Sequence, residues 1–277
     1  MRPLILSLLV PAILVVSCTL ADPGAGGPQA PAMAAAPGLS AQQKEKIGRR
    51  IWQNECAGTI DGLTTWNDGE NFPSMGIGHT IWYPAGINER FQETFPQLVR
   101  YMMDHGVRVP PWVVPPADCP WPNKKAFLAD FQSPKMKELR AWLSSTISVQ
   151  TDYLIGRQQA ALPKMLAACS PADQARVRAQ FAALSATPEG MFCLIDYVNF
   201  KGEGIRPEER YNGHGWGLLQ VLQEMRGQPR GQAAVKEFSL SSDRVLARRI
   251  ANSPPARGEE RWRAGWHNRC MRYQQAL

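Results

Sequence analysis

Histidine is scarce in this sequence, and the short motifs with which proteins commonly hold a metal ion are missing. Only four of the 277 residues are histidines, and no CxxC or HExxH pattern occurs. The sequence therefore gives little support for a metal site, and we expect no cofactor.

The sequence also lacks internal repeats, and its composition is ordinary. Charged side chains make up 20% of the chain and hydrophobic ones 44%, a balance typical of globular proteins. This composition disfavours a fibrous or disordered protein, and a chain of this length can bury a large core.

An apolar run near the start of the chain is typical of a secretory signal. Residues 4–16 are mostly apolar, follow Arg2, and are too few to span a membrane as a stable helix. The next residues complete the sequence "VVSC", which is similar to a bacterial lipobox in which Cys18 is acylated after cleavage. Cleavage after Ala21 is the alternative, and it would release a soluble protein.

We therefore expect a signal peptide over residues 1–17 and a flexible tether over residues 18–39. The tether contains "DPGAGGPQAPAMAAAPGL", which is rich in proline, glycine and alanine and shows no apolar period. The expected location is the periplasmic face of the bacterial envelope, with a lipid anchor on Cys18 holding the protein at the membrane.

Cysteine usage beyond the anchor indicates no disulfide pattern. Five cysteines remain, so at least one thiol is free, and their spacing does not reveal a pairing. They are Cys56, Cys119, Cys169, Cys193 and Cys270.

Positive charge is concentrated at the C-terminal end. The net charge is +7, and residues 226–277 carry 11 Lys and Arg against 4 Asp and Glu, so the preceding residues balance to zero. A basic surface suits an anionic polymer such as cell-wall glycan or a membrane surface, and export argues against nucleic acid. A solvated helical face explains the charge equally well.

The order of elements favours an α+β fold that is predominantly α. Ser40 can cap a helix that runs to about Glu55, and a glycine-rich stretch with short strands and turns follows. Residues 107–122 contain six prolines and cannot form regular structure. Helical patterns then occupy about 123–146, 148–168, 171–183, 188–199, 216–227, 229–239, 243–252 and 258–275.

Acidic residues near the end of the first helix suit glycoside hydrolysis. This reaction needs one carboxyl group that protonates the leaving oxygen and a second that activates water or stabilises the cation. Glu55 is the candidate acid, and Asp68 or Glu70 is the candidate second carboxylate. The stretch "GENFPSMGIGHTIWYP" at 69–84 would form a stiff hairpin wall that holds the second group at a fixed distance.

These residues resemble the phage-type lysozymes. That family has a glutamate at the end of its first long helix, then a hairpin with an aspartate, a threonine six residues later and a "GIGH" segment. Here Glu55, Asp68 and Ser74 occupy those places, and "GIGH" stands at 76–79. The resemblance implies a lysozyme-like fold with a small N-terminal β-hairpin region and a helical C-terminal lobe, in which Ser74 positions the attacking water.

The sequence departs from the family in two ways. Cys56 follows Glu55 where a glycine is usual, and the longer gap to Asp68 leaves Glu70 open as the second carboxylate. Similarity covers 48–83 well and about 190–275 loosely, so the domain expected over 40–277 would contain a proline-rich insertion at about 84–124. In the resembling lysozymes the histidine of "GIGH" is structural.

Several further residues are candidates for glycan contact. Trp82 and Tyr83 could stack on sugar rings, although core packing is equally compatible with them. Glu203 in "KGEG" is a candidate rim carboxylate and a third candidate for the acid–base pair. A glycine-punctuated loop, which could equally be a helix entry turn, contributes Tyr211, Asn212 and Trp216.

The sequence therefore predicts a lysozyme-like muramidase that cleaves peptidoglycan between N-acetylmuramic acid and N-acetylglucosamine. A lytic transglycosylase using Glu55 alone is one alternative. A non-catalytic envelope lipoprotein that binds peptidoglycan is the other.

Overall fold

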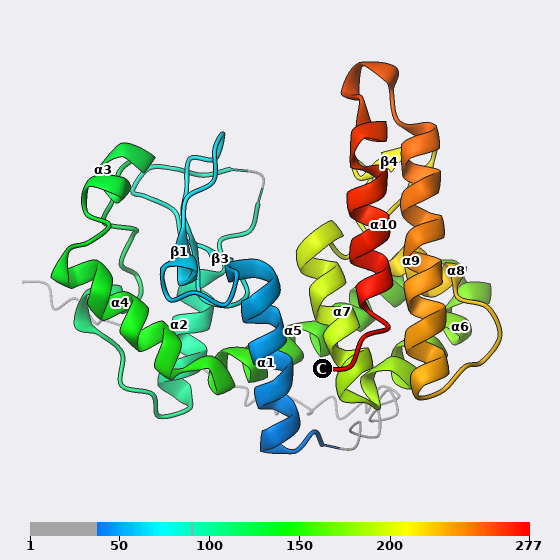
Figure 1. Ribbon diagram of the computed structural model, residues 1–277, viewed down its shortest axis with the longest axis horizontal. Helices are drawn as coiled ribbons and strands as arrows, with labels where there is room; N and C mark the ends of the chain where they lie inside the picture. Colours follow the sequence, from blue (N-terminus) through cyan, green and yellow to red (C-terminus); the bar gives the residue numbers. More distant parts are fainter. Residues whose placement is uncertain (1–37, 90) are drawn as a thin grey trace, which may run out of the picture. The chain divides into compact units, whose positions relative to one another are not determined.

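The computed structural model describes residues 38–89 and 91–277 (Figure 1). The expected signal peptide and Cys18, together with the tether up to residue 37, lie outside the described residues. Within the described part, no helix is long and apolar enough to cross a membrane.

The first helix, α1 (Ala41–Cys56), begins where the sequence predicts. The Ser40 side chain accepts a hydrogen bond from the backbone of Gln43, and the Gln43 side chain in turn accepts one from the backbone of Ser40. This reciprocal pair satisfies two amide groups that the helix itself leaves unpaired. The helix ends at Ala57, whose φ of 53° is left-handed, so the chain turns immediately after Glu55 and Cys56.

A small antiparallel sheet follows α1, after the 3₁₀ turn η1 (Asp61–Leu63). Its order is β1-β2-β3, in which Thr65 pairs with Ser74, and Ser74 pairs with Ile81. Each strand has two residues: β1 (Thr64–Thr65), β2 (Ser74–Met75) and β3 (Thr80–Ile81).

Most of the remaining chain is helical. The expected α+β class with mostly α structure is confirmed at this level. The longer helices are α2 (Phe95–Asp104), α4 (Pro134–Ser145), α5 (Ile147–Ala168), α6 (Pro171–Ser185), α7 (Pro188–Lys201), α9 (Gln232–Asn252) and α10 (Arg263–Arg272). Shorter elements are η2 (Pro111–Val113), α3 (Lys124–Ala129), β4 (Arg210–Tyr211), β5 (His214–Gly215), α8 (Leu218–Glu224), η3 (Pro255–Arg257) and η4 (Glu259–Trp262).

Several helix boundaries differ from those expected. The pattern at 123–146 is two helices, because Ser133 caps a new helix whose first residue is Pro134. Conversely, the patterns at 229–239 and 243–252 belong to one helix, α9, which lies beside α10 (Figure 1). The expected loop after α7 contains the two-residue hairpin of β4 and β5.

The proline-rich region is ordered by aromatic packing. As expected, 107–122 contains only the short 3₁₀ turn η2, but α2 precedes it within the region at 84–124. Trp82 lies at the centre of this packing, with ring centroids 6.1 Å from Trp112 and 6.4 Å from Trp121. These contacts attach the region to the sheet.

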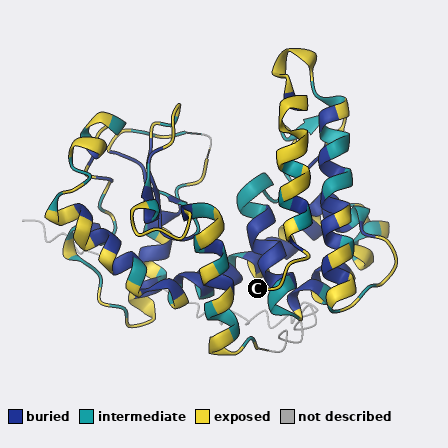
Figure 2. Cartoon of the chain, in the orientation of Figure 1, coloured by how far each residue is buried: buried dark blue, intermediate teal, exposed yellow. Residues whose placement is uncertain are grey.

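The core is continuous around α7. Residues 190–197 of this helix are all buried, and α7 packs against α1, α6 and α9 (Figure 2). All five cysteines in the described part are free thiols. The fold therefore rests on apolar burial rather than on disulfides.

Candidate functional site

A cleft of about 780 Å³ contains several of the predicted site residues. One side comes from the end of α1 and the glycine-rich stretch after it, and it includes Glu55, Glu70, Ser74 and His79. The other side comes from α5, the end of α7 and the segment that follows α7. Residues from this side include Arg157, Lys164, Asn199, Lys201, Glu203 and Trp216, and Arg249 of α9 lines the cleft as well.

Glu55 lies in the last turn of α1, where its side chain reaches the cleft while remaining mostly covered. Its side chain is 15% exposed. Arg269 donates a hydrogen bond from Nη2 to Oε1 of Glu55 at 2.7 Å, and Nδ1 of His79 lies 3.8 Å from Oε2. One carboxylate oxygen is therefore fixed by an arginine, and the other faces the histidine.

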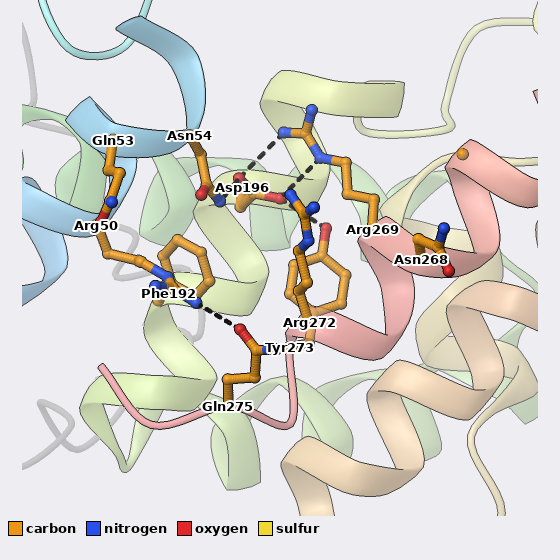
Figure 3. A pocket seen from close by; sticks show the side chains of 11 residues that line it. Arg50, Gln53, Asn54, Phe192, Asp196, Asn268, Arg269, Arg272, Tyr273 and Gln275 are labelled. Carbon is orange, nitrogen blue, oxygen red and sulfur yellow. Dashed lines mark hydrogen bonds and ion pairs between the residues drawn. The ribbon is translucent and has the colours of Figure 1, made fainter. Parts of the chain in front are cut away.

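Arg269 is itself held by a buried carboxylate. It donates to Asp196 from Nη2 at 3.0 Å and from Nε at 3.3 Å (Figure 3). Asp196, with a side chain only 1% exposed, also accepts hydrogen bonds from Tyr273 Oη at 2.7 Å and from Asn54 Nδ2 at 3.1 Å. Burial alone would lower the pKa of Arg269, but Asp196 and Glu55 outweigh it and raise that pKa above its ordinary value.

Arg269 and Asp196 were not among the site residues predicted from the sequence. Asp196 stands in "DYVNFKGEG" and Arg269 in "RWRAGWHNR". Asp196 directly follows an apolar run in the sequence, and this position was the signal for a functional or paired acid. Carboxylates are rarely buried without a partner.

The two candidates for the second carboxylate have different surroundings. Glu70 lines the cleft with Glu55, and its Oε2 accepts a hydrogen bond from Asn67 at 3.0 Å. Asp68 does not line the cleft; its side chain is fully exposed and pairs with Lys124 at 2.6 Å. The hydrogen bond and charge of Lys124 lower the pKa of Asp68. The structure thus brings Glu70, and not Asp68, into the cleft that contains Glu55.

Ser74 and His79 complete this side of the cleft. Ser74 belongs to β2 and is 5% exposed. His79 has a left-handed φ of 47°, and its Nε2 atom is buried without a hydrogen-bond partner among the described residues. Burial lowers the pKa of His79, although Glu55 and Glu70 oppose the shift. A neutral imidazole beside Glu55 at pH 7 is the result.

Trp82 and Tyr83 do not occupy a glycan-binding position, which corrects the expectation from sequence. Trp82 is 0% exposed and Tyr83 is 6% exposed. Their polar atoms are used internally, because Trp82 Nε1 donates to Ala117 O at 3.0 Å and Tyr83 Oη donates to Phe91 O at 2.9 Å. Both side chains are part of the core beneath the cleft.

Of the four candidate residues that follow α7 in the chain, two line the cleft and two do not. Glu203 lines the cleft, with an oxygen 3.8 Å from Lys164 Nζ, and Trp216 lines it as well. Tyr211 and Asn212 do not line the cleft. Tyr211 packs its ring on Trp216 at 4.6 Å and donates its hydroxyl to Glu259 at 2.9 Å, and it therefore supports the cleft from behind.

Lys201 is one of several cleft residues that were not predicted from the sequence. Its Nζ lies 4.0 Å from the ring centroid of Phe200 and 3.6 Å from that of Trp266, a cation–π arrangement. Burial first, and then the positive charge of Arg249, lower the pKa of Lys201 to about 7, although Glu259 opposes the shift. Its amine therefore titrates near neutral pH, where lysine is ordinarily charged.

The described residues contain no cluster of three or more His, Cys, Asp or Glu side chains arranged to hold a metal ion. Comparison of the whole chain with protein-family models, with curated proteins and with solved structures finds no match. Inference about function therefore rests on the cleft and on the sequence resemblance.

Proposed function

We propose that this protein is a lysozyme-like glycoside hydrolase of peptidoglycan, with Glu55 as general acid. The observation that carries the proposal is the position of Glu55. It is a mostly covered carboxylate at a helix end, fixed by Arg269, in a cleft of about 780 Å³ that also contains Glu70 and Ser74. Two carboxyl groups that face one cleft are what hydrolysis of a glycosidic bond requires.

In this mechanism the two carboxyl groups take different roles. Glu55 is the general acid and protonates the leaving oxygen of the glycosidic bond. Glu70 activates a water or stabilises the developing cation, and Ser74 orients that water. Arg269 positions Glu55, because its other contacts to Asp196 fix the direction of the guanidinium.

Charges around the cleft support a substrate that carries carboxylates. Arg157 and Lys164 come from α5, whereas Arg249 of α9 also lines the cleft but is paired with Glu259 at 2.8 Å. Peptidoglycan has carboxylates on its peptide stems, and these basic side chains would meet them beside the sugar chain. Trp216 lies at the same side of the cleft, but it is only 7% exposed and the Arg249 guanidinium lies 4.1 Å from its ring centroid, so it forms part of the cleft wall.

A lysozyme-like arrangement of the chain is part of this proposal. Support comes from a helix that ends at the candidate acid, a three-stranded antiparallel sheet after it, and a set of helices that returns Arg269 to that acid. Export to the periplasmic face of the bacterial envelope and anchoring at Cys18 also belong to the proposal, on the basis of the N-terminal sequence. The expected partners are peptidoglycan and the membrane.

The test is digestion of purified peptidoglycan by the full-length protein in mild detergent, with products identified by mass spectrometry. We expect reducing N-acetylmuramic acid ends from the wild type and none from Glu55→Gln. Asp68→Asn is the matched control, because it removes one carboxylate charge outside the cleft.

Two outcomes would overturn the proposal in different ways. Anhydro-muramic ends that vanish in Glu55→Gln would identify a lytic transglycosylase. Binding to peptidoglycan without any release, under conditions where a control lysozyme cleaves it, would identify a binding protein.

A further inference from the structure

A second cleft lies between α1, α7 and α10. Among the residues that line it, only Arg269 and its partners contribute to the proposed chemistry. Its volume is about 510 Å³ (Figure 3). Arginine is its most prominent residue type: Arg50 comes from α1, and Arg269 and Arg272 come from α10. Asp196 is the one acidic residue that lines it.

The positive charge in this cleft is only partly compensated. Arg269 is paired with Asp196 and Glu55. Arg272 is exposed, and its side chain makes no hydrogen bond or ion pair with any residue of the described ranges. Arg50 donates from Nη2 to Oε1 of Gln275 at 3.0 Å, which is a neutral acceptor (Figure 3). Two guanidinium groups therefore lack an anionic partner within one cleft.

Neutral hydrogen-bonding groups surround these arginines. Four side-chain amides line the cleft: Gln53, Asn54, Asn268 and Gln275. The two aromatic residues, Phe192 and Tyr273, are 4% and 2% exposed and present little apolar surface. A ligand here would meet charge and hydrogen-bonding groups rather than an apolar wall, and a cleft of this size holds more than a single small ion.

We propose that this cleft binds a phosphate-bearing ligand whose remaining part is polar, such as a glycerol phosphate group. A guanidinium group presents parallel N–H donors that match two phosphate oxygens, and two unpaired guanidinium groups can pair with the oxygens of one phosphate group. The amides would accept and donate hydrogen bonds to hydroxyl groups on the rest of the ligand. This binding does not depend on the proposed hydrolysis of glycan.

The first measurement is calorimetric titration of the full-length protein with glycerol 3-phosphate at low ionic strength. We expect Arg50→Gln and Arg272→Gln each to weaken binding by about tenfold, because each removes a charged hydrogen-bond donor that faces the phosphate group. Arg178→Gln on α6 is the matched control, because it removes the same charge from an exposed position outside the cleft. Thermal unfolding of each variant checks that the fold is intact.

A second arm distinguishes a soluble phosphate from a lipid headgroup. Flotation compares vesicles of phosphatidylglycerol with vesicles of phosphatidylcholine, and the lipid anchor contributes equally to every variant. A preference for phosphatidylglycerol that disappears in the Arg50→Gln, Arg272→Gln double variant identifies a headgroup. Binding of glycerol 3-phosphate without any such preference identifies a soluble ligand.

Three results would overturn the proposal. The first is no binding of either probe by the wild type. The second is equal weakening in Arg178→Gln, which would mean that net charge alone attracts the anion. The third is equally tight binding of succinate, a dicarboxylate, which would mean that the cleft does not select phosphate.

Discussion

Arg269 near the end of α10 donates a hydrogen bond to Glu55 at the end of α1 at 2.7 Å, although 214 positions separate the two residues in the chain. Through its other contacts, the same guanidinium group binds Asp196 of α7. One side chain thus joins three helices at the candidate acid. Most of our predictions concern this junction or the cleft beside it.

Replacing Arg269 tests its positioning role. In Arg269→Met, Asp196 remains buried without its cationic partner, and we expect the free energy of unfolding to fall by about 3 kcal/mol, the lower end for a broken buried pair. Glycan cleavage should fall about 100-fold, because Glu55 is no longer fixed. Arg269→Lys should recover part of the stability but little of the activity, since lysine lacks the planar fork that binds both carboxylates.

Urea denaturation and product release from peptidoglycan measure these two effects. Arg178→Gln, at an exposed position of α6 outside both clefts, should change the rate by no more than about twofold and the stability by no more than about 0.5 kcal/mol. Full activity in Arg269→Lys would contradict the positioning role.

Substitutions that remove the charge of Glu70 or of Asp68 show which of the two is the second catalytic carboxylate. Glu70→Gln should lower the rate of glycan cleavage by about 100-fold or more, because general acid–base groups contribute about 10²–10⁴-fold. Asp68→Asn should stay within about twofold, because Asp68 is fully exposed and paired with Lys124 outside the cleft. Initial rates on the same peptidoglycan preparation provide the comparison, and the reverse pattern would assign the role to Asp68.

The lowered pKa of Lys201 predicts a pH-dependent effect on stability. Its pKa falls from 10.5 to about 7 in the folded protein, so between these values the unfolded chain binds more protons and stability rises with pH. Below about pH 7 the cost of the buried charge is present in full. Lys201→Met should therefore be more stable than the wild type at pH 6, and this advantage should shrink as the pH approaches 10.

Denaturant unfolding at pH 6, 7.5 and 9 measures that difference. The matched control is Lys236→Met, because Lys236 is exposed on α9 and its replacement should produce no such trend. An advantage of Lys201→Met that stays constant from pH 6 to 9 would show that Lys201 does not titrate in this window.

Two glycines with similar φ angles allow the cost of backbone strain to be measured separately from the cost of side-chain crowding. Gly86 has a φ of 77° and open space around it, so Gly86→Ala should cost about 1 kcal/mol from the left-handed conformation alone. Gly76 of "GIGH" has a φ of 71°, and a Cβ there would also collide with Oε1 of Gln150. That oxygen accepts a hydrogen bond from the backbone of Ile77 at 2.9 Å.

Gly76→Ala should therefore cost about 1–3 kcal/mol more than Gly86→Ala, as overpacking of a filled site does. Thermal or urea unfolding of the two variants measures the gap. Equal costs would mean that Gln150 moves aside freely and that the "GIGH" turn is not held by it.

Features that depend on neighbouring residues were predictable from the sequence. Ser40 begins α1 because its hydroxyl caps the free amides of the first turn, and this capping needs no distant partner. Local sequence patterns likewise predicted that Glu55 lies in the last turn of a helix and that short strands follow this helix. The predominance of helix follows in the same way from apolar residues repeated at helical spacing.

Tertiary structure alone decided which of these residues meet. Glu70 and Asp68 are two positions apart with the same functional group, and only the folding of the turn puts Glu70 in the cleft and Asp68 beside Lys124. Trp82 belongs to the core because distant aromatic rings pack against it. Arg269 reaches Glu55 because α1, α7 and α10 pack around a buried Asp196. Such contacts join segments far apart in sequence, and local periodicity carries no information about them.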